Sequence, residues 1–262
     1  FIFQPSEEVT DDEGKSGAMR MVDEGVMEGV DAVVGLHLGA PLPSGKLFFA
    51  TGPIMAGAAE VHIEVHGKSS HAGMPEAGVD ALVLAARGVV AVQDAAPERR
   101  SPVEDGLISF GRIAGGTAHN VLADLVTIEG TMRFFSEEVR ERLHRRLDEA
   151  FGALKDSGAE VTIQLGTGYL PVINDERVTE WVRAAAIDLV GEDDVLPIQP
   201  MTLAEDFSFL AHEAPGTFFW LGAALPRPRM HHEADFDIDE SALPLGAATL
   251  AAGAIRLLEE MA

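Results

Sequence analysis

The chain has 262 residues, with 19 basic and 43 acidic side chains and a net charge of −24. This charge repels the phosphates of nucleic acids and anionic lipids, so we expect neither as a partner. The chain has no cysteine, which excludes disulfides and thiolate metal sites and leaves the cytoplasm as the default compartment. No apolar run is long enough to predict a membrane helix, so we expect no contact with a membrane.

The first elements predict an α/β layer. The apolar residues 1–3 predict a strand that Gln4 and Pro5 end, residues 18–25 predict a helix, and residues 31–38 form a nearly continuous apolar run. Such a run is typical of a strand covered on both faces, and strand-helix-strand alternation favours a parallel sheet. Because the chain opens directly on an apolar run without Met, we interpret it as lacking an N-terminal segment.

The middle of the chain predicts a different domain. Apolar and polar residues alternate over 59–66, as in a strand with one buried face. The elements expected after it are a helix over 78–93, strands over 107–113 and 125–134, a helix over 137–155 and a strand over 161–165. The order strand, helix, strand, strand, helix, strand is that of a ferredoxin-like α+β domain.

The last third of the chain returns to the α/β pattern. We expect a helix over 176–190, a strand over 217–222 and a C-terminal helix over 241–260. The middle domain is therefore predicted to be an insertion. The predicted boundaries are residues 1–56 and 169–262 for the two parts of the outer domain, and 57–168 for the inserted one.

Three short clusters carry residue types that bind metals. Glu7 and Glu8 follow a predicted strand and a proline, so one carboxylate could bind a metal while the other carries a proton, although adjacent glutamates in loops are more often solvated. His37 lies in an apolar run, where a satisfied core histidine is the commoner case. His231 and His232 precede an acidic run, and spacing alone does not decide between a ligand and a solvated loop.

The inserted domain has a further candidate in His71, which lies in a glycine-flanked loop after a strand. Such a histidine could donate to a developing oxyanion, but an exposed loop histidine is again the commoner case. The glycine-rich segment 115–120 matches no phosphate-binding pattern, and no serine lies in a nucleophile elbow.

Read together, these clusters resemble one family, the metallopeptidases of the aminoacylase and glutamate carboxypeptidase type, in the branch that contains hippurate hydrolase and the indoleacetyl-amino acid hydrolases. The landmarks of the resemblance are Phe3-Gln4-Pro5-Ser6-Glu7-Glu8, Gly35-Leu36-His37, Gly67-Lys68-Ser69-Ser70-His71-Ala72, Ala118-His119-Asn120-Val121, Ala204-Glu205-Asp206-Phe207-Ser208 and the segment from His232 to Glu240. The resemblance implies a partial zinc-peptidase-like α/β catalytic domain with an inserted ferredoxin-like lid or dimerisation domain.

The resemblance also implies roles for the clustered residues. Glu7 is similar to the general base that activates water, and Glu8, His37 and His232 are similar to metal ligands. His232 is preferred to His231 because it stands four residues before Phe236, as the family's ligand does. The cofactors implied are two divalent ions, zinc or manganese.

In the inserted domain, His71 resembles the lid histidine that meets the tetrahedral intermediate, Asn120 resembles a substrate-binding residue, and Arg133 is a weaker candidate for pairing with a substrate carboxylate. The implied reaction is amide hydrolysis of an N-acyl amino acid or short peptide, in a possible homodimer formed through the lid. The family's opening motif, with a histidine and a bridging ligand, is expected before Phe1, so this chain alone is expected to be inactive.

Two kinds of rival remain at this point. The nearer rivals are other activities of the same family, namely dipeptidase, carboxypeptidase and deacetylase. The more distant rival is a protein that binds a ligand or partner without catalysis. A substrate panel separates the first kind, and metal stoichiometry separates the second.

Overall fold

The computed structural model describes residues 1–97, 101–227 and 229–262. The chain divides into two compact units. Unit 1 contains Phe1–Met55, Val172–Met201 and Glu205–Ala262, and unit 2 contains Ala56–Pro171 and Thr202–Ala204.

Unit 1 is built on a four-stranded sheet in the order β1-β10-β2-β9. Its strands are β1 (Val33–Gly39), β2 (Leu47–Phe49), β9 (Val195–Pro197) and β10 (Gly216–Gly222). The pairs β1–β10 and β2–β9 are parallel, but β2 runs antiparallel to β10. The sheet is therefore mixed, and the predicted parallel arrangement holds for β1–β10 and β2–β9 but not for β2 and β10. The connection from β1 to β2 is too short for the crossover that parallel strands need, so the chain reverses direction instead.

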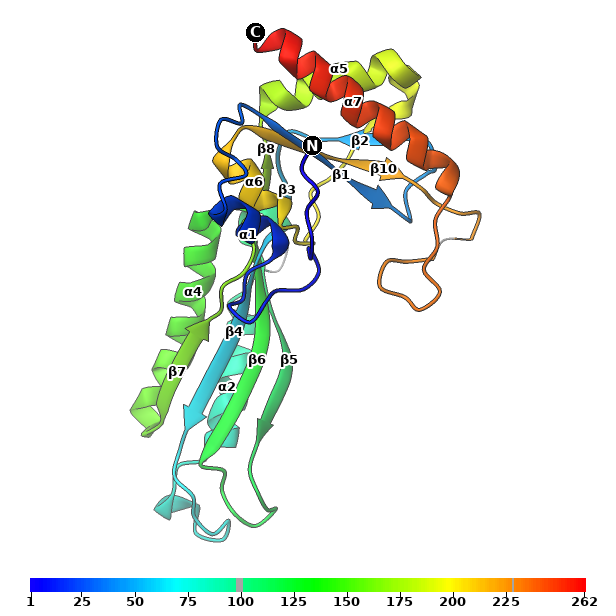
Figure 1. Cartoon of the computed structure of the whole chain (residues 1–262). Coiled ribbons are helices and arrows are strands. Elements are labelled where there is room, and N and C mark those ends of the chain that lie inside the picture. Colours follow the sequence, from blue (N-terminus) through cyan, green and yellow to red (C-terminus); the bar gives the residue numbers. More distant parts are fainter. Residues whose placement is uncertain (98–100, 228) are drawn as a thin grey trace. The chain divides into compact units, whose positions relative to one another are not determined.

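Helices cover both faces of this sheet. α5 (Glu176–Val190) and α7 (Leu243–Glu260) pack together on one face, and α1 (Gly17–Asp23) and α6 (Phe207–Glu213) lie on the other (Figure 1). The central strand β10 is buried along its whole length. Because side chains alternate along a strand, Phe218 and Trp220 join the core beneath α6, whereas Phe219 and Leu221 join the core beneath α5 and α7.

The C-terminal helix is the exception to the expectation that no segment is apolar enough for a membrane. The segment Glu240–Glu260 passes that test by length and composition. A core helix passes the same test, and α7 packs closely in unit 1: a Cβ on Gly246 would meet Leu221 of β10 at 2.9 Å, and one on Gly253 would meet Val182 of α5 at 3.0 Å. One face of α7, with the buried residues Gly246, Thr249, Gly253 and Leu257, therefore packs on unit 1.

Unit 2 has one antiparallel sheet in the order β5-β6-β4-β7. Along the chain its main elements are β4 (Gly57–His66), α2 (Ala81–Asp94), β5 (Leu107–Gly115), β6 (Leu125–Phe134), α4 (Glu137–Gly152) and β7 (Glu160–Leu165). Buried and less buried residues alternate along β4, and the buried set packs against α2 and α4. Helix starts are fixed locally, because Asp80 and Ser136 accept hydrogen bonds from the first turns of α2 and α4.

Short elements complete the fold. In unit 1, β3 (Gly52–Met55) pairs with β8 (Val172–Asn174) in a two-stranded antiparallel sheet. The other short elements are α3 (Pro102–Asp105), η1 (Pro75–Ala77), η2 (Ala153–Ser157), η3 (Glu192–Asp194) and η4 (Glu240–Ala242).

The first predicted strand is wrong. Residues 1–3 form no regular element, and no strand among the described residues pairs with them. Ile2 packs against the core of unit 1, whereas Phe1 and Phe3 are exposed. An apolar run becomes a strand only when its backbone finds a ladder partner, and this run has none among the described strands.

Candidate active site

The loop that follows residues 1–3 carries the adjacent carboxylates Glu7 and Glu8. Ser6, directly before them, has a φ of 53°, which is unusual for a residue with a side chain. Its hydroxyl donates to the carbonyl of Val9 at 2.7 Å, and its own carbonyl accepts from the N–H of Gly17 at 3.1 Å. A Cβ on Gly17 would lie 1.5 Å from the carbonyl oxygen of Pro5, so only glycine allows the two ends of the loop to meet.

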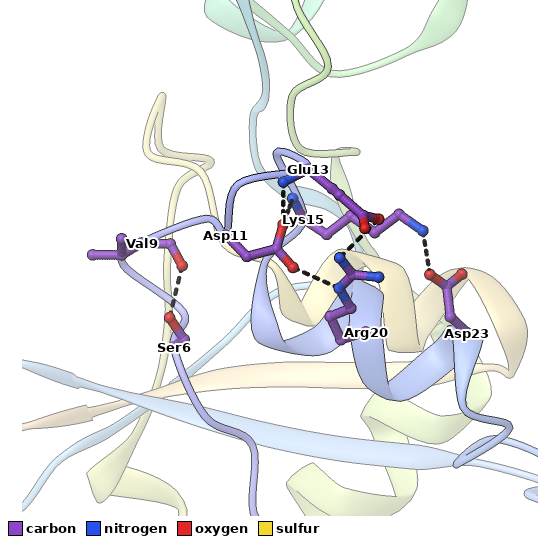
Figure 2. Close-up of polar contacts among 7 residues, drawn as sticks. All are labelled: Ser6, Val9, Asp11, Glu13, Lys15, Arg20 and Asp23. Carbon is purple, nitrogen blue, oxygen red and sulfur yellow. Dashed lines mark hydrogen bonds and ion pairs between the residues drawn. The ribbon is translucent and has the colours of Figure 1, made fainter.

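A polar network stiffens the far side of this loop (Figure 2). The Asp11 carboxylate accepts hydrogen bonds from the backbone N–H groups of Glu13 and Lys15, and from Arg20 of α1. The hydrogen bond from Arg20 is the main cause that lowers the pKa of Asp11 to about 2. Lys15, in the loop, forms an ion pair with Asp23 at the end of α1. The loop is therefore tied to α1 along its exposed side.

Three carboxylates meet beneath the loop. Glu7, Glu205 and Asp206 each place one oxygen within 4.8 Å of the others. Burial is the largest cause that raises the pKa of Glu7, and the charges of Glu8 and Asp206 raise it further, while a hydrogen bond from the Asp206 backbone opposes them. Burial and the charge of Glu7 raise the pKa of Glu205 to about 8. Glu7 and Glu205 therefore each hold a proton to a higher pH than a free carboxyl does.

His37 lies near the end of β1, where the register pairs it with Trp220 of β10. Its ring packs against Trp220 with centroids 4.6 Å apart, and the ring of His231 lies 5.3 Å away. His37 Nδ1 lies 2.7 Å from the carbonyl oxygen of Leu38. A carbonyl only accepts, so Nδ1 carries the proton and Nε2 keeps the lone pair that a metal would use.

The two neighbouring histidines of the C-terminal loop have different surroundings. His231 Nε2 accepts a hydrogen bond from the N–H of Ala40 at 3.2 Å, and burial lowers the pKa of His231. His232 has a φ of 65°, and its Nε2 lies 3.7 Å from Oε1 of Glu8. The side chains of His232 and Glu8 are 73% and 68% exposed, respectively. Thus Glu8 and His232, predicted from distant segments, lie together, while His231 packs beside His37.

The candidates of unit 2 divide into two places. His71 and Asn120 lie in exposed loops, and the N–H of Ala72 donates a hydrogen bond to the carbonyl of Asn120 at 2.9 Å. In the sheet register, Arg133 of β6 lies opposite Ala58 at the start of β4. The His71 loop instead follows the end of β4, and the Asn120 loop precedes Leu125, which pairs with His66 at that end. At about 3.3 Å per residue, Arg133 is roughly 25 Å from that end. Burial lowers the pKa of Arg133.

Three residues near the predicted site were not predicted to act there. Glu205 and Asp206 are 6% and 0% exposed, and His231 lies against His37. The sequence offered one signal for the carboxylates, because an acidic pair directly before the apolar Phe-Ser-Phe-Leu run is unusual at the start of a buried helix. Their proximity to Glu7 depends on a contact across about 200 positions, which local patterns do not encode.

The sequence was also compared with known protein families and curated proteins. Peptidase family M20/M25/M40 matches the chain over residues 1–256. The N-acetyl-L-cysteine deacetylase of Bacillus subtilis strain 168 is 33% identical over 98% of this chain and 60% of its own length. The IAA-amino acid hydrolase ILR1-like 4 of Arabidopsis thaliana is 30% identical over 99% of this chain and 60% of its own length.

A solved structure is also similar. The YXEP protein of Bacillus subtilis, described as a dinuclear metal-binding peptidase of the M20 family, has a TM-score of 0.79 and 26% identity, and it matches 98% of this chain and 64% of its own. The chain thus spans about 60% of the length of the curated relatives that it matches. With the family model covering almost all of its residues, the chain belongs to peptidase family M20/M25/M40.

Proposed function

We propose that the complete protein hydrolyses the amide bond of N-acyl amino acids with the help of divalent metal ions. The observation that carries the proposal is the pair Glu7 and Glu8: one carboxyl is half-buried with a raised pKa, and the other reaches toward His232. Relatives described as deacetylases and as an amino acid conjugate hydrolase support this reaction class.

The candidate ligands are one carboxylate and two imidazoles, a set that suits divalent metals of intermediate softness. Glu8, His37 and His232 would hold such a metal, and imidazole with carboxylate fits zinc or manganese. The proton on His37 Nδ1 leaves Nε2 free, whereas the N–H of Ala40 occupies Nε2 of His231, which favours His232 as the ligand from this loop. When bound, divalent ions supply Lewis acidity and lower the pKa of water.

The remaining steps belong to side chains of this chain. Glu7 takes a proton from the attacking water and returns it to the leaving amine, which its raised pKa favours. His71 donates to the developing oxyanion. Asn120 and Arg133 bind the substrate, with Arg133 pairing with its carboxylate. Because these residues lie roughly 25 Å apart along β4, Arg133 would come from one copy of the homodimer, and His71 and Asn120 would come from the other.

Three ligands do not complete two metal sites, since a zinc ion alone takes about four. We therefore propose that these 262 residues by themselves bind metal weakly and do not turn over. Unit 2 would act as the lid, with residues 57–168 as its expected extent, and would join two copies as a homodimer. We propose a cytoplasmic location.

A substrate panel tests the proposal. The complete protein is stripped of metal, reloaded with zinc or manganese, and assayed with N-acetyl amino acids, hippurate, indoleacetyl-amino acids and dipeptides. Turnover of an N-acyl amino acid that a chelator abolishes and metal restores is the expected result. Turnover of dipeptides alone would favour the dipeptidase alternative, and no metal binding with no turnover would favour a non-catalytic protein.

A further inference from the structure

Asp206 is fully buried in the turn that begins α6. A buried carboxylate is costly unless hydrogen bonds replace its hydration. Both of its oxygens accept such bonds, and both donors come from the N-terminal segment. The Gln4 side-chain amide donates to Oδ1, and the backbone N–H of Ala18 donates to Oδ2 at 3.0 Å.

These two donors flank the carboxylate pair. Gln4 lies just before Glu7 and Glu8, and Ala18 lies in the first turn of α1, just after their loop. Between these two contacts, the backbone of Asp206 is hydrogen-bonded to Glu7. Asp206, directly before α6, therefore contacts the loop before, at and after the proposed base.

The next residue connects this anchor to the strand that carries His37. A Cβ on Gly35 would meet the Phe207 ring at 2.8 Å, so Phe207 packs directly on the backbone of β1, two residues before His37. The loop itself is closed by the close approach of Gly17 to Pro5. A closed loop anchored at Asp206 keeps a fixed position relative to β1.

We propose that Asp206 is a positioning residue that sets the place of Glu7 relative to the strand bearing His37. The inference rests on the proposed function, since it assigns Asp206 to the alignment of the same proposed base. A misplacement of about 1 Å at a reacting group can cost on the order of 10²-fold in rate. Anchoring by charge-assisted hydrogen bonds is a way to avoid such a loss.

The first test replaces the anchor in the complete, metal-loaded protein. Asp206→Ala should lower kcat on the order of 10²-fold and leave KM within about threefold, because alignment rather than binding is lost. Asp175→Ala is the matched control, since Asp175 caps α5 by accepting from the N–H of Val178 in the same unit. It should lower stability and leave kcat unchanged.

A second pair of variants tests the contact without truncation. Gln4→Glu places a second carboxylate against Asp206 and removes the donor, so kcat should fall. Adding Asp206→Asn restores a matched pair, because the introduced amide donates to the introduced carboxylate while its oxygen accepts from the N–H of Ala18. The double variant should therefore regain most of the lost kcat. Equal kcat in the single and double variants would overturn the proposal even if Asp206→Ala does not fold.

Hydrogen exchange separates this inference from the proposed function. In Asp206→Ala, the amides of Gly17 and Ala18 should exchange faster by about tenfold, with amides of unit 2 unchanged. If the native protein hydrolyses no substrate, the proposed function fails and the exchange result still decides whether Asp206 anchors the loop. Native exchange in the variant overturns the proposal, as does kcat within about threefold of native in an active enzyme.

Discussion

The two units differ in what they bury. Among the residues that the structure describes, the buried polar or charged side chains all belong to unit 1: Ser16, Asn174, Thr179, Glu205, Asp206, Ser208, Thr217 and Thr249. The main core of unit 2 is made of apolar residues on one face of a regular sheet and the helices that cover it. Buried polar groups cost stability unless they are paired.

The cost in stability of burying polar groups therefore falls on unit 1, which contains the proposed base. Two of the buried groups in unit 1, Glu205 and Asp206, are carboxylates that lie beside the proposed base. Unit 2 instead carries its candidate residues His71 and Asn120 in exposed loops. We interpret unit 1 as the unit that holds the proposed base and its neighbouring carboxylates in place, and unit 2 as a scaffold for the exposed loops of His71 and Asn120.

The largest expected effect concerns the buried carboxyl Glu205. Its pKa is raised from 4.5 to about 8, first by burial and then by the charge of Glu7. Between these values the folded state holds a proton that the unfolded state has lost, so stability falls as pH rises. The slope is about 1.4 kcal/mol per pH unit, and at most about 5 kcal/mol is lost in total.

Glu205→Gln has no proton to lose, so it should remove the contribution of Glu205 to this slope and make the metal-free protein more stable than the native one at pH 8. Urea unfolding at pH 4.5, 6 and 8 measures the effect. Glu259→Gln, at the exposed end of α7, is the control and should keep the native slope. If Glu205→Gln unfolds with the native pH dependence, ionising Glu205 does not lower the stability of the protein, and the proposed cost of burying this charge is contradicted.

Matched core truncations test whether the two units are separate in stability. Leu47 of unit 1 and Leu143 of unit 2 are both fully buried. Each Leu→Ala change should destabilise its own unit by roughly 2–5 kcal/mol. If the units unfold separately, calorimetry of each variant shows one shifted transition and one native transition. A single transition shifted equally by both variants would show that the units unfold together.

The comparison also predicts that unit 2 contributes to catalysis through an exposed loop. His71→Ala in the complete enzyme should lower kcat on the order of 10²–10³-fold, equivalent to about 2.7–4 kcal/mol, if His71 donates to the oxyanion. His144→Ala, on the exposed side of α4, should leave steady-state kinetics unchanged. Native kcat in His71→Ala would leave unit 2 a scaffold without a catalytic group.

The same contrast explains how much of the fold could be predicted. The main strands and helices of unit 2 were predicted with small shifts at their ends, because the alternation along β4 and the amphipathic pattern of α4 are local signals, whereas the short α3 was not predicted. In unit 1 the helix Glu176–Val190 was predicted at its observed bounds. β2 and β9 have three residues each and pair across the chain, so no periodicity identifies them.

The candidate site was predicted in part for the same reason. The motif resemblance named Glu8 and His232, and the structure brings them within 3.7 Å, but their roles stay predictions. The resemblance covered Glu205 and Asp206 as a landmark without a role. Their carboxylates matter only because α6 packs beneath the loop of Glu7, which is a tertiary contact.

The central claim is the division of roles between Glu7 and Glu8, and its most direct test measures kcat and metal content together in the complete protein. Glu7→Gln should lower kcat on the order of 10²–10⁴-fold while the bound metal stays at the native level, because a base is lost and no ligand is removed. Glu8→Ala should lose bound metal. Native kcat in Glu7→Gln, or native metal content in Glu8→Ala, would contradict the assignment.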